Sequence, residues 1–203
     1  MFDELVHKNQ TPQLKSYYKV YNSNGRIKQM EKFYEGKLKG LIYYKDLDES
    51  HQQILDNIFV PGKFLSIVES ETRSGGYILE KEFYFSIDGM LSSRSNMLYD
   101  INKDLIAAEL ITDLNTGIPD YNNTEKFFYD RNVNPDEYLF NCRYDEDGRL
   151  KELYYNNHHN NSDGQDSFLL DDSPEDIQEL RELTGISQQL AEYYMSPNVI
   201  PNF

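Results

Sequence analysis

The chain has 203 residues, of which 38% are hydrophobic and 14% aromatic, and it carries a formal net charge of -15. This length favours one domain, with or without an appendage, over two full domains. The many Tyr and Phe residues argue against wholesale disorder. A single cysteine, Cys142, excludes an internal disulfide and a metal site built from cysteines, so nothing in the sequence requires an oxidising compartment.

The charge is unevenly distributed along the chain. Residues 1–45 contain nine Lys or Arg and four Asp or Glu, whereas residues 46–203 contain eleven and thirty-one. The acidic part would repel a phosphate backbone, so direct nucleic-acid binding is not expected. A basic protein is its natural complement. Acidity could equally serve only to keep the protein soluble.

No segment of the sequence predicts a membrane span. The first eight residues carry acids where a signal peptide needs positive charge, and no apolar run follows them. No later stretch approaches the roughly 18 apolar residues that a spanning helix requires. We therefore expect a cytoplasmic protein that does not associate with membranes.

The clearest local pattern lies in residues 18–34, where two alternating runs flank Asn24-Gly25. Asn-Gly accepts the positive φ angles of a tight hairpin turn, so this segment predicts a strand, a turn and a second strand. A further turn at Gly36 and a third strand over residues 40–44 would complete a meander.

The same pattern returns in residues 82–99 and 138–155, each with an aromatic strand, an Asp-Gly turn and an apolar residue two places after the glycine. We interpret all three copies as hairpins of one sheet system. In the third copy, alternation places four residues on one covered face, namely Tyr138, Phe140, Cys142 and Tyr144. These aromatic residues are interpreted as sheet packing and cross-strand pairing rather than as a platform for a stacked ligand.

Between the hairpins, residues 49–58 predict a short helix that ends before Pro61-Gly62, and residues 64–68 predict a strand. Residues 105–112 fit either a helix or a strand, and their strand neighbours favour a strand.

In the carboxyl-terminal part, the spacing of apolar residues changes from the two-residue period of strands to the period of helices. Residues 157–172 predict a polar acidic loop, and residues 173–196 predict a helical hairpin in which Gly185 ends the first helix and Ser187 caps the second. The predicted fold class is thus α+β, mainly antiparallel β. A meandering hairpin sheet occupies residues 1–156, and the helical hairpin packs on the same domain.

Three segments resemble known families. Residues 25–44 resemble the variant MORN repeat of bacterial toxin–antitoxin-associated proteins, through the turn glycine, the paired aromatic residues, the Gly-Lys turn and a second glycine before an apolar-Tyr-Tyr strand. Residues 144–150 resemble the Tyr-Asp (YD) repeat unit of Rhs-type toxins. Both resemblances imply a hairpin sheet, and together they suggest an immunity-like protein. Residues 180–191 are similar to a helix-hairpin-helix, but Ser187 replaces its second turn glycine and acidic flanks would repel a phosphate, so a plain packed hairpin is favoured.

No recognisable catalytic or cofactor motif is present. Cys142 has no histidine near it in the sequence, and no Gly-x-Ser-x-Gly elbow or phosphate-binding glycine loop occurs. His158-His159, close to Asp163 and Asp166, is the one place where metal ligation could be imagined, and we interpret it as a solvated polar loop. We therefore expect no catalytic residue, no metal and no cofactor.

These observations favour a non-enzymatic immunity or antitoxin protein that binds and neutralises a basic toxin. The expected contact residues are acidic and lie in the third hairpin turn and around the start of the helical hairpin: Asp145, Glu146, Asp147, Asp171, Asp172, Glu175, Asp176 and Glu179. One alternative is a non-inhibitory interaction or scaffold module. Another is an enzyme of unrecognised type, which would need ionisable side chains that converge in a pocket.

Overall fold

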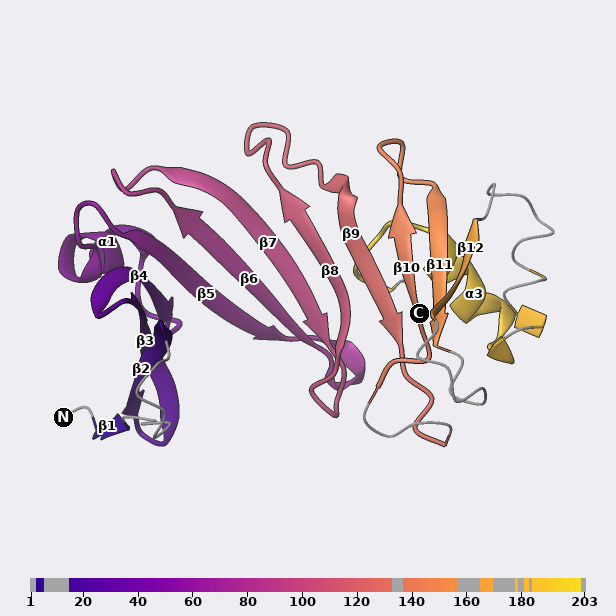
Figure 1. The fold of residues 1–203 in the computed structure, drawn as a ribbon, viewed down its shortest axis with the longest axis horizontal. Coiled ribbons are helices and arrows are strands. Elements are labelled where there is room, and N and C mark those ends of the chain that lie inside the picture. The colour runs from indigo at the N-terminus through magenta and orange to yellow at the C-terminus, as the bar shows by residue number, and fades with distance from the viewer. Residues whose placement is uncertain are drawn as a thin grey trace. The chain divides into compact units, whose positions relative to one another are not determined.

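The computed structural model describes residues 3–5, 15–132, 137–156, 165–169, 178, 181–182 and 184–201. It shows an α+β fold that is mainly antiparallel β (Figure 1). The elements are β1 (Asp3–Leu5), β2 (Ser16–Ser23), β3 (Arg26–Tyr34), β4 (Lys37–Tyr44), α1 (His51–Ile58), β5 (Phe64–Thr72), η1 (Ser74–Gly76), β6 (Ile78–Phe85), β7 (Leu91–Tyr99), β8 (Leu105–Ile111), β9 (Asp120–Phe128), β10 (Phe140–Tyr144), β11 (Leu150–Asn156), β12 (Gln165–Leu169) and α3 (Gln188–Met195).

Strands that follow one another in the chain are hydrogen-bonded neighbours, from β1 through β12. β4 and β5 are parallel, and α1 provides the crossover between them. The chain divides into two compact units. Unit 1 comprises Met1–Glu71 and Glu80–Arg94, and unit 2 comprises Thr72–Leu79 and Ser95–Phe203. The helical hairpin was expected to pack on the same domain as the sheet, and α3 belongs to the same unit as β8 to β11.

The meander of unit 1 confirms the predicted Asn-Gly hairpin. Asn24 and Gly25 have φ angles of 52° and 74°, as a two-residue turn of this hand requires. The predicted helix is also present. Ser50 caps α1, because its Oγ accepts from the backbone N–H of Gln53 while the Gln53 side chain accepts from the backbone N–H of Ser50. Ile54 of α1 packs into a buried cluster with Leu41, Tyr43, Leu65, Ile67 and Phe85.

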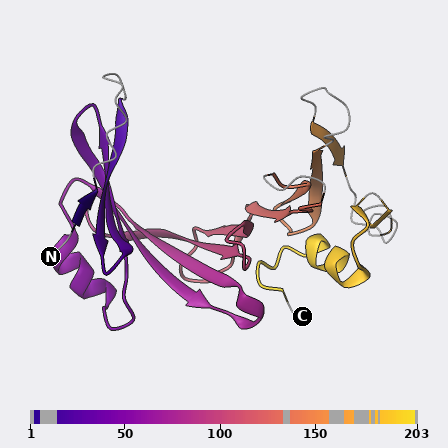
Figure 2. The same ribbon diagram turned by 90° about the horizontal axis from the view of Figure 1, so that it is seen from below.

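In unit 2, residues 105–111 form a strand, as favoured from the sequence. The helix α3 lies against the sheet at β10 and β11 (Figure 2), and its Ala191 and Tyr194 enter the buried cluster that holds Phe140 and Cys142. Ser187 caps α3 as predicted, since its side chain accepts from the backbone N–H of Leu190. The first predicted helix is described at residues 178, 181–182 and 184, which are helical, and Gly185 ends it at a φ of 70°.

One prediction for the carboxyl-terminal part is wrong. Residues 165–169 were expected in the polar loop, but they form β12 and pair with β11. This short segment has no apolar alternation of its own, so its extended conformation depends on backbone hydrogen bonds to β11. The rest of the predicted loop, including His158-His159, lies outside the described residues.

The described helices include none that is long and apolar enough to cross a membrane.

Candidate functional site

The predicted acidic contact residues of the third hairpin form a turn whose first carboxylate has a structural role. Oδ1 of Asp145 accepts hydrogen bonds from the backbone N–H groups of Asp147 at 3.0 Å and Arg149 at 2.9 Å. Glu146 and Asp147 remain exposed. The other predicted contact residues lie outside the described part of the chain: Asp171, Asp172, Glu175, Asp176 and Glu179.

The structure also shows an acidic surface that sequence reasoning missed. Leu79 and Phe85 of β6 are buried on one face of the strand. The residues that alternate with them, Glu80, Glu82 and Tyr84, lie on the other face. The alternation of apolar and polar residues is visible in the sequence of this strand. It does not predict an exposed acidic surface, because neighbouring residues do not determine which face of a strand the rest of the fold will cover.

Hydrogen bonds hold these carboxylates in place. Ser70 donates to Glu80 at 3.1 Å, and the Tyr84 hydroxyl donates to Glu82 at 2.8 Å. Tyr44 follows Tyr43, which is buried toward α1, so alternation along β4 places Tyr44 on the same face of the sheet as Glu80 and Glu82. Burial raises the pKa of Tyr44, and the charges of Glu80 and Glu82 raise it further. Within the described ranges, neither glutamate makes an ion pair. We call Tyr44, Glu80, Glu82 and Tyr84 the open acidic face.

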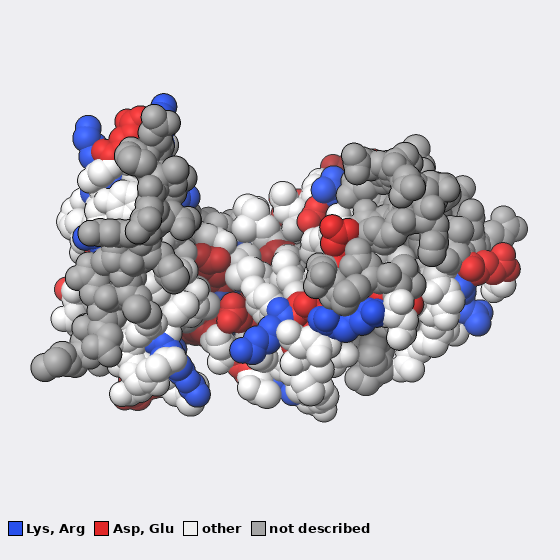
Figure 3. Space-filling model, turned by 60° about the horizontal axis from the view of Figure 1, so that its bottom comes forward, with Lys and Arg blue, Asp and Glu red and all other residues white. Residues whose placement is uncertain are grey.

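On the face drawn in Figure 3, the described acidic side chains do not form one continuous surface. On the side of the molecule drawn in Figure 3, acidic and basic side chains lie interspersed among neutral ones. A basic partner would therefore recognise local groups of carboxylates rather than a uniform field.

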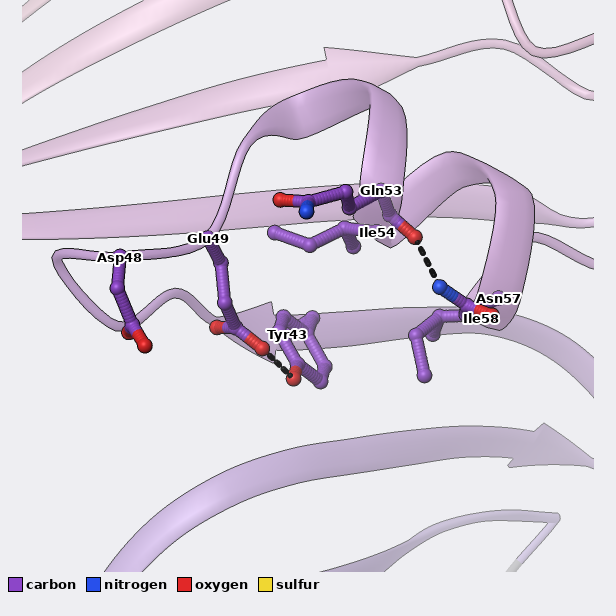
Figure 4. Close-up of a pocket in the computed structure, with 7 residues that line it drawn as sticks. All are labelled: Tyr43, Asp48, Glu49, Gln53, Ile54, Asn57 and Ile58. Carbon is purple, nitrogen blue, oxygen red and sulfur yellow. Dashed lines mark hydrogen bonds between the residues drawn. The ribbon is translucent and has the colours of Figure 1, made fainter.

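A second candidate is a cavity of about 300 Å³ beside α1 (Figure 4). Figure 4 shows Gln53, Ile54, Asn57 and Ile58 entering from α1, Tyr43 from β4, and Asp48 and Glu49 from the preceding loop. The wall is therefore partly apolar, partly aromatic and partly acidic.

An ion network centred on the buried Lys28 lies beside the cavity and shares Tyr43 and Glu49 with its wall. Lys28 on β3 is 9% exposed, and its Nζ donates to Asp46 at 2.6 Å and to Glu49 at 2.7 Å. Burial disfavours the charge of Lys28, but these hydrogen bonds outweigh burial and raise the pKa of its ammonium group. The other oxygen of Glu49 accepts from the Tyr43 hydroxyl at 2.7 Å. Burial would raise the pKa of Glu49, yet the hydrogen bonds from the backbone N–H of Asp46 and from Lys28 lower it overall.

Two ionisable side chains of unit 2, Lys126 and Cys142, are fully buried. Lys126 on β9 and Cys142 on β10 are paired across the sheet, and both are 0% exposed. Burial lowers the pKa of Lys126 to about 7 and raises the pKa of the Cys142 thiol. Nζ of Lys126 donates to the carbonyl oxygens of Tyr193 and Ser196, at the end of α3, where helical carbonyls lack partners. This arrangement fastens α3 to the sheet.

In the described part of the chain, no group of three or more His, Cys, Asp or Glu is arranged to hold a metal ion. The fold and its surfaces define an α+β protein with a mainly antiparallel sheet. No family model, curated protein or solved structure matches the chain.

Proposed function

We propose that this protein binds and inhibits a basic protein partner, in the manner of an immunity protein that neutralises a toxin. The observation that supports the proposal is the open acidic face, where two glutamates that form no ion pair with any described residue lie on the same face of the sheet as two tyrosines.

Such a surface suits lysine and arginine side chains. Glu80 and Glu82 are two positions apart on one strand, so their Cα atoms lie about 7 Å apart and their side chains share one face. Each carboxylate can therefore accept a cationic side chain from the same partner surface. A cation placed there can also lie over a tyrosine ring. Hydrogen bonds from Ser70 and Tyr84 already orient the carboxylates, so binding costs less side-chain entropy.

The buried positions of Lys126 and Cys142 favour binding over catalysis. Both side chains have shifted pKa values of the kind that mark candidate catalytic groups. Each lies in the core under α3, however, where a substrate could reach it only after that unit opens. Their pKa shifts therefore follow from packing.

The test is a binding titration with the purified product of the adjacent gene, combined with co-expression to measure neutralisation. We expect binding in the micromolar range or tighter that weakens as salt rises. The double variant Glu80→Gln/Glu82→Gln should weaken it by about tenfold and reduce neutralisation.

The matched control is Glu146→Gln/Asp147→Asn, which removes the same charge from the exposed hairpin turn. Glu146 and Asp147 are among the contacts expected from the sequence, so the two variants compare two candidate surfaces. If the open acidic face is the interface, the Glu146/Asp147 variant should bind as the wild type does. If the control loses binding and the Glu80/Glu82 variant keeps it, the turn is the interface and the open acidic face is not. Binding without neutralisation would indicate a scaffold, and no binding at micromolar concentrations would refute the proposal.

A further inference from the structure

We propose that the cavity beside α1 is a binding site for one lysine or arginine side chain of a partner protein. The inference goes beyond the proposed function, because the cavity lies on the α1 side of the sheet while the open acidic face lies on the other. It holds for any partner that presents a basic side chain.

The size and lining of the cavity suit a side chain. Its volume of about 300 Å³ lies at the bottom of the range of roughly 300–1,000 Å³ that small-molecule sites occupy, so a group of side-chain size fits better than a large cofactor. Ile54 and Ile58 supply apolar surface for an aliphatic stem, and Tyr43 supplies a ring face. Lysine and arginine bury their stems in this way while the charged end stays near polar groups.

Two residues of the cavity wall, Tyr43 and Glu49, already contact an ammonium group of the chain itself, that of Lys28. Nζ of Lys28 lies between the carboxylates of Asp46 and Glu49 and 4.6 Å from the centroid of the Tyr43 ring. The neighbouring residues thus combine carboxylates and an aromatic ring in a geometry that binds a primary amine. This internal contact is an independent indication that the surroundings favour a cation.

Acceptors remain for a second cation. Asp48 lines the cavity and makes no ion pair with any residue in the described ranges. The amide nitrogen of Asn57 donates to the backbone oxygen of Gln53 at 2.7 Å, which leaves the Asn57 side-chain oxygen as an acceptor. In Figure 4, Asp48 and Asn57 lie on opposite sides of Tyr43, so the two acceptors flank the ring.

The local charge selects the sign of the occupant. Residues 46–58 contain four Asp or Glu and no Lys or Arg, and Lys28 compensates only one of those charges. A carboxylate or phosphate would be repelled, whereas an ammonium or guanidinium group would be attracted.

The experiment titrates the ¹⁵N-labelled protein with n-butylammonium and n-butylguanidinium chloride at constant ionic strength and follows amide chemical shifts. We expect saturable shifts concentrated in residues 46–58, and none with n-butanol. Asp48→Asn should weaken the binding at least about threefold. Asp56→Asn removes the same charge from α1 at a residue that does not line the cavity, and it should bind the probes as the wild type does. Circular dichroism verifies that both variants fold.

The inference would be overturned by the absence of a saturable shift at 50 mM probe, by shifts spread over the whole molecule, or by equal weakening of probe binding in the Asp48 and Asp56 variants. The source of the basic group is tested by comparing acetyl-Gly-Arg-Gly-amide with free arginine. If the capped peptide binds at least as well as free arginine, the result supports a side chain of a partner protein as the occupant. If free arginine binds more tightly, the inference is refuted. Because these probes need no toxin, the result is independent of the neutralisation test.

Discussion

Lys126 provides the sharpest test of how unit 2 is held together. Burial lowers the pKa of its ammonium group to about 7, whereas a lysine in an unfolded chain titrates near 10.5. Between these two pH values unfolding takes up a proton, so the free energy of unfolding should rise with pH at up to about 1.4 kcal/mol per pH unit. Below about pH 7 both states are protonated, and the cost of the buried charge is fully present.

Cys142 limits the pH window of this rise. Burial raises the pKa of its thiol above the usual value of 9.0, so unfolding releases a proton above about pH 9 and stability falls there. The two effects oppose each other above pH 9. The rise is therefore confined to pH 7–9 and should amount to about 2 kcal/mol. Lys126→Met should abolish the rise, because methionine does not titrate.

The single cysteine supplies the assay. Cys142 is 0% exposed, so its alkylation requires unit 2 to open. Dividing the alkylation rate by the rate for urea-unfolded protein at the same pH gives the equilibrium constant of opening, and its logarithm gives the free energy of opening. Lys151→Met, which removes an exposed lysine from β11, is the matched control and should keep the rise. A wild-type opening free energy that stays flat from pH 7 to 9, or a Lys126→Met variant that keeps the slope, would refute the reasoning.

Three further predictions concern stability in urea titrations followed by circular dichroism. Ser50→Ala removes the capping box of α1 and should lower the free energy of unfolding by about 1 kcal/mol. Lys28→Met leaves two carboxylates without their shared cation and should lower it by about 1 to 2 kcal/mol, and an unchanged midpoint would contradict a stabilising network. Gly148→Ala should cost about 2 kcal/mol or more, because φ is +80° and the new Cβ would lie 2.9 Å from the Pro197 ring. Gly117→Ala is the matched control, because its φ is +68° and no atom lies within 4 Å of the new Cβ. It should lower the free energy of unfolding by only about 1 kcal/mol. Equal losses in the two variants would show that the contact with Pro197 does not add to the cost of Gly148→Ala.

Local sequence signals predicted much of the fold. The Asn24-Gly25 turn, the capped helix α1 and the cap of α3 each depend on residues a few positions apart, so composition and spacing are sufficient to recognise them. Alternation likewise revealed the strands of the third hairpin. It did not predict that Leu139 and Asn141 would be buried as well as Phe140 and Cys142, because burial of the second face depends on what else packs there.

The candidate sites depended on contacts that are distant in the sequence. Lys28 meets Asp46 and Glu49 only because β3, β4 and the loop before α1 are neighbours. Tyr44 and Glu80 lie in one sheet only because β5 pairs between β4 and β6. The sequence therefore determined turns, caps and the acidic character of the chain, since these follow from neighbouring residues. Only the tertiary structure decided which carboxylates accept hydrogen bonds in turns and ion networks and which remain available on a surface, because this depends on which strands pair and which faces are covered.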